Sequence, residues 1–114
     1  MKTIRNIIVQ SEFTALHSWA DCDILEVEFL KELHRHIFKV QIKLAVTTVH
    51  RDLEFFMVKN YLDSFLKLYQ GLKLVNKSCE EMCQEIYDFV KLKYSSVFYV
   101  SVFEDGENGS ELIS

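Results

Sequence analysis

The chain has 114 residues, of which 49% are hydrophobic and 26% are charged, and its formal net charge is -4. This length suits one domain that buries its own core, so we expect a single domain over residues 1–114. The net negative charge disfavours binding to nucleic acid, which depends on Lys and Arg. Apolar runs stay well short of the roughly 20 residues that a membrane span needs. Neither a nucleic acid nor a membrane is therefore expected as a partner.

The N-terminus and the cysteines predict a cytoplasmic protein. The first residues, MKTIRNIIVQSEF, lack the long apolar core and the small-residue cleavage site of a secretory signal. Cys22, Cys79 and Cys83 are an odd number, and their spacing matches neither a disulfide framework nor a CxxC zinc motif. We expect all three to be free thiols in a reducing compartment.

Two strands are expected in the first half of the chain. Residues 3–16 are rich in β-branched and aromatic side chains, which favour a strand. Residues 18–33 follow no regular period and predict a loop, with a short helical turn over residues 27–33. From His34 to His50 apolar and polar side chains alternate, which predicts a long strand with one solvated face.

Two helices are expected next. Over residues 54–69 the apolar side chains recur at steps of three and four, which is typical of one face of a helix, and Gly71 is placed to end it. Ser78 and Glu81 have the spacing of a capping box, which starts a second helix. The apolar stripe of this helix consists of Cys79, Met82, Cys83, Ile86, Phe89 and Val90.

The end of the chain predicts a second pair of strands. Residues 97–104 alternate and are rich in strand-forming side chains, and the pairs DG at 105–106 and NG at 108–109 favour a hairpin turn into residues 110–113. The order strand, strand, helix, helix, strand, strand predicts an α+β fold, an antiparallel four-stranded sheet with both helices on one face. Open edges of so small a sheet are normally paired or covered, so we expect a homo-oligomer.

Three histidines are candidates for a metal site. His34 and His36 are two residues apart in an expected strand, so both side chains leave the same face. Antiparallel pairing of the first two strands brings His17 alongside them. Three imidazole nitrogens without a thiolate suit Zn²⁺ at about 2.0–2.1 Å and leave a fourth position for water or substrate. Alternatively, an H-x-H pair arises by chance and is simply two solvated side chains.

Five segments, in chain order, carry a resemblance to a known family. Residues 13–17 (FTALH) and 33–40 (LHRHIFKV) are similar to F-x-A-x-H and L-H-G-H-x-Y-x-V motifs. Residues 53–55 (LEF) are similar to a V-x-D-F segment, residues 76–80 (NKSCE) to an N-P-T-S-E helix start, and residues 100–104 (VSVFE) to a last strand that ends in Glu. Together they resemble the 6-pyruvoyl- and 6-carboxy-tetrahydropterin synthases.

The resemblance implies the T-fold, in which subunits join their sheets into an oligomeric barrel, a hexamer being one form. It implies Zn²⁺ held by His17, His34 and His36, and a pterin-like heterocycle whose N–H edge pairs with Glu104. A carboxylate suits that role because it accepts two parallel hydrogen bonds. Without the family, Glu104 is an ordinary charged residue leading into a turn. The implied activity is that of a carbon–oxygen lyase in queuosine or biopterin biosynthesis.

The chain departs from the family at its proton carriers. The family's catalytic Cys lies four residues before the H-x-H pair, where this chain has Leu30, and the family's Asp-His pair has no counterpart between the expected helices. Cys22, Glu28 and Glu32 are candidates to replace these groups. His50 is a candidate only toward a neighbouring subunit, because roughly 45 Å of ideal strand separates it from the other histidines.

Three functions remain open at this stage. The chain is a zinc-dependent pterin-type synthase acting on a dihydroneopterin-type or related heterocyclic substrate, or it is a catalytically silent zinc protein that binds or sequesters a pterin- or purine-like small molecule. In the third, the chain is a structural oligomer whose zinc only stabilises the hairpin. The lost proton carriers favour the second function more than the family resemblance alone does.

Overall fold

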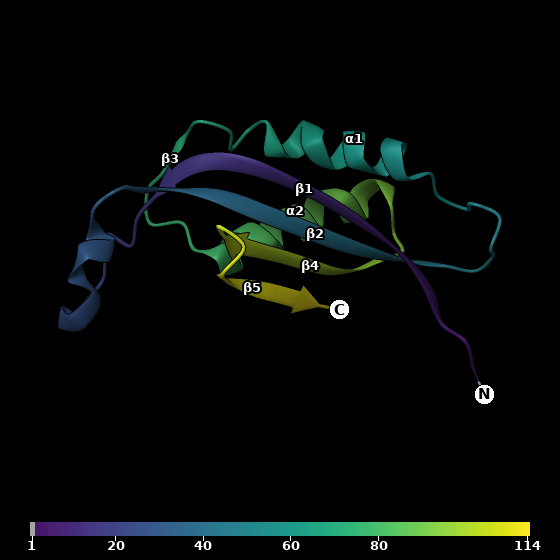
Figure 1. The fold of residues 1–114 in the computed structure, drawn as a ribbon, viewed down its shortest axis with the longest axis horizontal. Coiled ribbons are helices and arrows are strands. Elements are labelled where there is room, and N and C mark those ends of the chain that lie inside the picture. The colour runs from purple at the N-terminus through teal and green to yellow at the C-terminus, as the bar shows by residue number, and fades with distance from the viewer. Residues whose placement is uncertain (1) are drawn as a thin grey trace.

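The computed structural model describes residues 2–114 and consists of one curled sheet with helices packed on one face (Figure 1). The strands lie in the order β3-β1-β2-β4-β5, and all neighbours are antiparallel except β3, which runs parallel to β1. Their bounds are β1 Arg5–His17, β2 His34–Val46, β3 Lys73–Leu74, β4 Val97–Glu104 and β5 Asn108–Ile113. The α+β prediction is confirmed, with five strands in place of the expected four.

The two longest strands form the centre of the sheet. β1 and β2 pair over their whole length, from Arg5 opposite Val46 to His17 opposite His34. Alternate residues of β2 face the helices and are fully buried, because strand side chains alternate between the two faces. The core beneath the helices includes Phe38, Ile42, Leu44, Leu62, Met82, Ile86, Val100 and Val102.

β2 is shorter than the alternation predicts. The expected strand runs to His50, but β2 ends at Val46 and this part of the prediction is wrong. The Asp52 carboxylate accepts the backbone N–H of Thr47 at 2.9 Å and its hydroxyl at 3.0 Å, and Arg51 has a φ of 57°. These interactions satisfy the backbone locally and turn the chain away from the sheet. His50 therefore lies in an exposed turn.

The helices begin at side-chain caps. α1 (Phe55–Leu66) starts after Glu54, whose carboxylate accepts the backbone N–H groups of Phe56 and Met57. It ends earlier than predicted, and turns continue to Gly71, where φ is +73°. α2 (Cys79–Lys93) starts at the predicted capping box. Residues 2–114 include no helix with the length and apolar character needed to cross a membrane.

Between β1 and β2 the chain forms an arm that extends past the end of the sheet (Figure 1). Its 3-10 helix, η1 (Leu25–Lys31), corresponds to the expected helical turn but starts two residues earlier. β3 is the strand that the sequence did not predict. Two residues give no periodicity, so only tertiary hydrogen bonds such as Leu16 N–H to the Leu72 carbonyl at 3.0 Å reveal it.

Candidate metal centre

Three histidine rings meet at one end of the sheet. His17 and His34 are direct partners across β1 and β2, and His36 lies two residues further along the same face of β2. The ring centroids are 4.5 Å apart for His17 and His34, 5.2 Å for His17 and His36, and 5.1 Å for His34 and His36. The predicted convergence of these side chains is what the structure shows. Phe38 packs edge-on against the rings of His17 and His36 and stacks on Phe13, so this side of the cluster is apolar.

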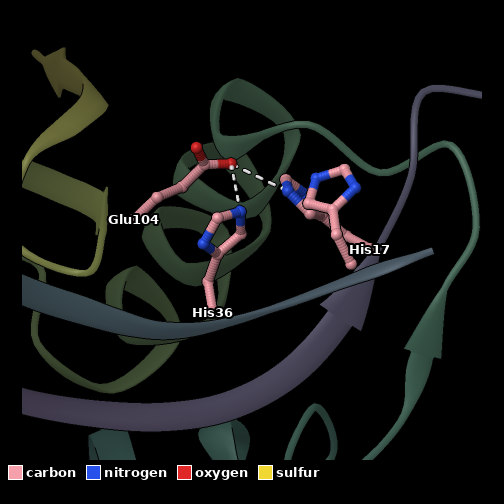
Figure 2. A group of neighbouring side chains, drawn as sticks. His17, His36 and Glu104 are labelled. Atoms are coloured by element: carbon pink, nitrogen blue, oxygen red, sulfur yellow. Dashed lines mark ion pairs between the residues drawn. The ribbon is translucent and has the colours of Figure 1, made fainter. Parts of the chain in front are cut away.

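Glu104, at the end of β4, joins the histidines. The β2–β4 register places it opposite Phe38, and one carboxylate oxygen lies 2.8 Å from His17 Nε2 and 3.8 Å from His36 Nε2 (Figure 2). Potential ligand atoms of His17, His34, His36 and Glu104 all lie within 4.8 Å of one another. The sequence predicted a carboxylate that faces a heterocycle, whereas here it faces the imidazoles.

Each histidine is held from outside by its other ring nitrogen. The Nδ1 atoms lie at hydrogen-bonding distance from oxygens: His17 from the Lys77 carbonyl at 3.0 Å, His34 from the Glu32 carbonyl at 2.8 Å, and His36 from the Asp105 carboxylate at 2.7 Å. A carbonyl or carboxylate oxygen accepts, so Nδ1 carries the proton in each ring. Nε2 is then the nitrogen with the free lone pair in each ring, and for His17 and His36 it faces Glu104 in the cluster. Rings held at one nitrogen and free at the other are typical of metal-bound histidines.

The chemistry of this donor set fits a cation. His17 is only 7% exposed, and its Nε2 is a buried nitrogen without a hydrogen-bond partner. Burial lowers the pKa of His17, although the Lys77 carbonyl and the charge of Glu104 act in the opposite direction. A neutral His17 directs a lone pair at a carboxylate oxygen 2.8 Å away, which is unfavourable unless a proton or a metal ion is shared between the two groups. In the described part of the chain, the three Nε2 atoms and Glu104 are the groups that could hold a metal ion.

The distances between the potential ligand atoms lie on both sides of the spacing that a tetrahedral zinc site requires: 2.8 Å from His17 Nε2 to Glu104, and up to 4.8 Å within the cluster. Ligand atoms at about 2.0–2.1 Å from a tetrahedral Zn²⁺ are roughly 3.3 Å apart. The four groups span up to 4.8 Å. Small rotations of side chains bring them to that spacing while the outer hydrogen bonds keep the rings oriented.

Asp105 holds His36 through a turn that the sequence marked only as a hairpin. One carboxylate oxygen faces His36 Nδ1, the other accepts the backbone N–H of Ile37 at 2.9 Å, and the Asp105 N–H donates to the Ile37 carbonyl at 2.8 Å. The hydrogen bonds from His36 and Ile37 lower the pKa of the Asp105 carboxyl. A φ of 55° lets Asp105 leave β4 and reach back to His36.

A second loop fixes the carbonyl that orients His17. Asn76 has a φ of 58°, its amide donates to the Asp21 carboxylate at 2.7 Å, and its backbone N–H donates to Ser18 Oγ at 3.2 Å. The next residue is Lys77, whose ammonium lies 2.6 Å from the Glu85 carboxylate. These bonds join the loop before α2 to the arm after β1.

A cavity of about 580 Å³ opens beside the cluster. His17, His34 and Glu104 line one part of it, and the first turn of α2 lines another. Leu30, at the position of the family's catalytic Cys, is also in the lining. The volume is in the range of small-molecule sites.

None of the candidate proton carriers lines this cavity. The thiol of Cys22 is buried and faces the carbonyls of Ile24 and Val27 at 3.7 and 3.8 Å. Glu28 and Glu32 are exposed, and only the backbone carbonyl of Glu32 reaches the cluster. His50 lies at the opposite end of the sheet.

Cys79, which the sequence assigned to the core, is buried and also lines the cavity, and its apolar-stripe position gave no sign of this second contact. Burial, then the charge of Glu104, raises its pKa to about 12. The thiol is thus protonated at neutral pH. Cys22, Cys79 and Cys83 are all free and buried, as predicted for the thiols.

No protein-family model and no curated protein matches this chain. Several solved structures, however, match it over nearly its whole length. The 6-pyruvoyl tetrahydropterin synthase of Caenorhabditis elegans superposes with a TM-score of 0.79 at 12% identity, over 98% of this chain and 96% of that one. This chain has the fold of the 6-pyruvoyl tetrahydropterin synthases. The Plasmodium vivax enzyme gives a TM-score of 0.70 at 16% identity, over 97% and 98% of the two chains. An uncharacterised protein of Wolinella succinogenes gives 0.78 at 12% identity, over 99% of each chain.

Proposed function

We propose that the chain is a zinc-dependent pterin-type synthase of the lyase class, acting on a dihydroneopterin-type or related heterocyclic substrate. Zn²⁺ is held by Nε2 of His17, His34 and His36, and Glu104 receives the N–H edge of the heterocycle. The observation that carries the proposal is the convergence of three imidazole rings, each held at Nδ1, with potential ligand atoms within 4.8 Å of one another. The likeness over nearly the whole chain to solved 6-pyruvoyl tetrahydropterin synthases supports the substrate class.

The metal, Glu104 and the two phenylalanines have different roles in the proposed reaction. Zn²⁺ in this site supplies polarisation of a hydroxyl or carbonyl group of the substrate. Glu104, with 29% of its side chain exposed, is open enough to accept ring N–H groups. Phe13 and Phe38 exclude water from below the histidines, which strengthens electrostatic interactions in the site.

A second candidate function is a catalytically silent zinc protein that binds or sequesters a pterin- or purine-like molecule. Leu30 in the cavity wall favours it, since a leucine cannot transfer a proton. In the P. vivax enzyme a glutamate is described as a catalytic residue, so a carboxylate serves catalysis in that protein. Here Glu28 and Glu32 are exposed and outside the cavity, which leaves the synthase without an obvious equivalent.

Turnover by zinc-loaded protein separates the two functions. 7,8-Dihydroneopterin and its triphosphate are offered separately, with His36→Ala as the metal-site control. A synthase gives product with one of them, and the product disappears in the control. If neither is converted but one binds, the binding protein stands. Leu30→Cys then places a thiol in the cavity, and turnover gained by this variant alone identifies the missing proton carrier.

We also propose a homo-oligomer, such as a hexameric ring, in the cytoplasm. The outer edge of β5 is unpaired within residues 2–114, and open edges favour pairing with another chain. On the arm, Leu25 is 82% and Phe29 69% exposed, which favours burial against a second copy. The free thiols support a reducing compartment. Light scattering of the native chain and of a Leu25→Ser, Phe29→Ser variant tests the assembly, and a native monomer would exclude it.

A further inference from the structure

The end of the sheet that carries the histidines has two surfaces of opposite charge. The first is the arm, residues 18–33, which has five carboxylates and one lysine and therefore a net charge of -4. The second, here called the basic segment, is residues 67–77, which has three lysines and no carboxylate. β3 belongs to the basic segment and pairs with Leu16 and His17, so both surfaces flank the same end of the sheet (Figure 1).

Each surface also exposes large apolar side chains. On the arm, Leu25 is 82% and Phe29 69% exposed, and in the basic segment Leu68 and Val75 are each 62% exposed. Burial of such side chains stabilises an interface, and their grouping on one surface marks a site where another protein binds. The two surfaces do not cover each other within one chain, so we expect a second copy to supply the contact.

The charges on both surfaces are available to a partner. Within residues 2–114, no ion pair involves Glu26, Glu28, Lys67 or Lys73. None of these four side chains belongs to the candidate metal centre, so a cation bound there changes the sign of neither surface. Opposite charges that face one another across an interface fix its orientation and speed association.

A two-fold axis uses both surfaces of each chain at once. In such a pairing the arm of one copy lies on the basic segment of the other, and the reverse contact is identical. Each pair of chains then has two contacts between an acidic and a basic surface. Pairing of arm with arm, or of basic segment with basic segment, would instead bring like charges together.

We propose that the arm docks on the basic segment of a second copy of this chain, and that two copies exchange these contacts about a two-fold axis. The proposal rests on the homo-oligomer proposed above and names surfaces that build it, in addition to the edge of β5. Trp19 and Leu30 of the arm and Asn76 of the basic segment line the cavity beside the histidines. The second copy therefore lies at the rim of this cavity and adds side chains to it.

Charge reversal tests the pairing in the zinc-loaded full-length chain. The arm variant is Glu26→Lys, Glu28→Lys, and the segment variant is Lys67→Glu, Lys73→Glu. Each variant gives both surfaces the same sign, so we expect sedimentation velocity to show self-association weakened at least about tenfold at low salt and less at high salt. An equimolar mixture of the two variants restores opposite charges between chains, and one chain with all four changes does the same. Both should assemble as the native chain does.

The matched control is Lys91→Glu, Lys93→Glu. It changes the net charge as the segment variant does, but in the exposed last turn of α2, outside both surfaces. We expect it to assemble as the native chain does. The mixture can assemble only if both of its variants are folded, so restored assembly also shows that the reversals leave the fold intact.

The outcomes separate this docking from the oligomer on which it rests. A native monomer would mean that the homo-oligomer and the docking are both wrong. If the native chain forms an oligomer that neither reversal weakens, or one with an odd number of subunits, the oligomer stands and the two-fold docking is wrong. The docking is also wrong if the control weakens assembly as much as the reversals do, or if neither the mixture nor the fourfold variant restores it.

Discussion

The two ends of the long β1–β2 pair both carry histidine, yet only one end is organised for chemistry. At the end where His17 faces His34, each ring is fixed by an oxygen acceptor behind it. At the other end, roughly 40 Å away along 13-residue strands, His50 sits in a turn with its ring exposed. The two ends therefore differ in the oxygens that lie behind the rings, and oxygens of this kind orient histidines in metal sites.

The largest expected effect comes from removing one inward nitrogen. His36→Ala deletes a proposed zinc ligand, so zinc affinity should fall by much more than the roughly 10- to 100-fold that loss of an outer partner costs. Competition with a chromogenic chelator measures the affinity. His50→Ala is the control at the far end and should leave it unchanged. If His36→Ala and His50→Ala bind zinc with equal affinity, the proposed difference between the two ends of the β1–β2 pair is wrong.

A smaller effect is expected from the partner behind His36. Asp105→Asn keeps a side chain that tolerates positive φ but removes the carboxylate that binds His36 and Ile37 together. Zinc affinity should fall roughly 10- to 100-fold. The matched variant is Asp52→Asn, which removes a turn carboxylate at the other end and should not change the affinity. A native-like affinity in Asp105→Asn would mean that His36 needs no orienting group.

The loop behind His17 predicts an effect on stability. Asn76→Ala loses the amide bond to Asp21 and keeps a β-carbon at a φ of 58°, where a β-carbon costs about 1–2 kcal/mol relative to glycine. Asn76→Gly loses the same bond without that cost and should be the more stable variant. Arg51→Ala, at a φ of 57° in the far turn, exchanges one β-carbon for another and should change stability little. The free energies of unfolding of the three variants, measured with urea on metal-free protein, test this order.

The smallest expected effect is on the pH dependence of stability, through Asp52 at the end of the sheet away from the histidine cluster. The hydrogen bonds from Thr47 are the first cause of the lowered pKa of Asp52. A carboxyl with a lowered pKa in the folded state stabilises the protein above its unfolded pKa of about 3.9, and this contribution disappears as pH falls through the folded pKa. The gap in urea midpoint between native protein and Asp52→Asn, both metal-free, should therefore begin to narrow as pH falls toward about 4 and continue to narrow as pH falls through the lowered folded pKa of Asp52. A gap that stays constant as pH falls would exclude the linkage.

The inward-facing part of the centre was predictable because it follows from side-chain parity. His34 and His36 share a face by spacing, and antiparallel pairing brings His17 opposite His34. The capping box at Ser78 was equally visible, since both members have a residue type suited to the role. Local rules of this kind need no knowledge of distant contacts.

The oxygens that lie next to the Nδ1 atoms of the histidines were not predictable, because they depend on contacts between distant parts of the chain. The carbonyls of Lys77 and Glu32 belong to the backbone, so no residue type marks them. Asp105 has the sequence of a turn residue, and its contact with His36 depends on the β2–β4 register. The same holds for the end of β2, where the alternation continues to His50 while the Asp52 side chain competes for the backbone.

The cluster lies where β1 and β2 are already hydrogen-bonded to each other, so a bound metal is not needed to hold these strands together. An ion held by His17, His34 and His36 would cross-link β1 and β2, whose hydrogen-bonded ladder is complete without it. The loop over residues 18–33 is closed by the pairing of His17 with His34, so a cross-link there removes little additional chain entropy. The apoprotein should therefore fold, and chelators should empty the centre without unravelling the chain, in contrast to small zinc domains that collapse when stripped.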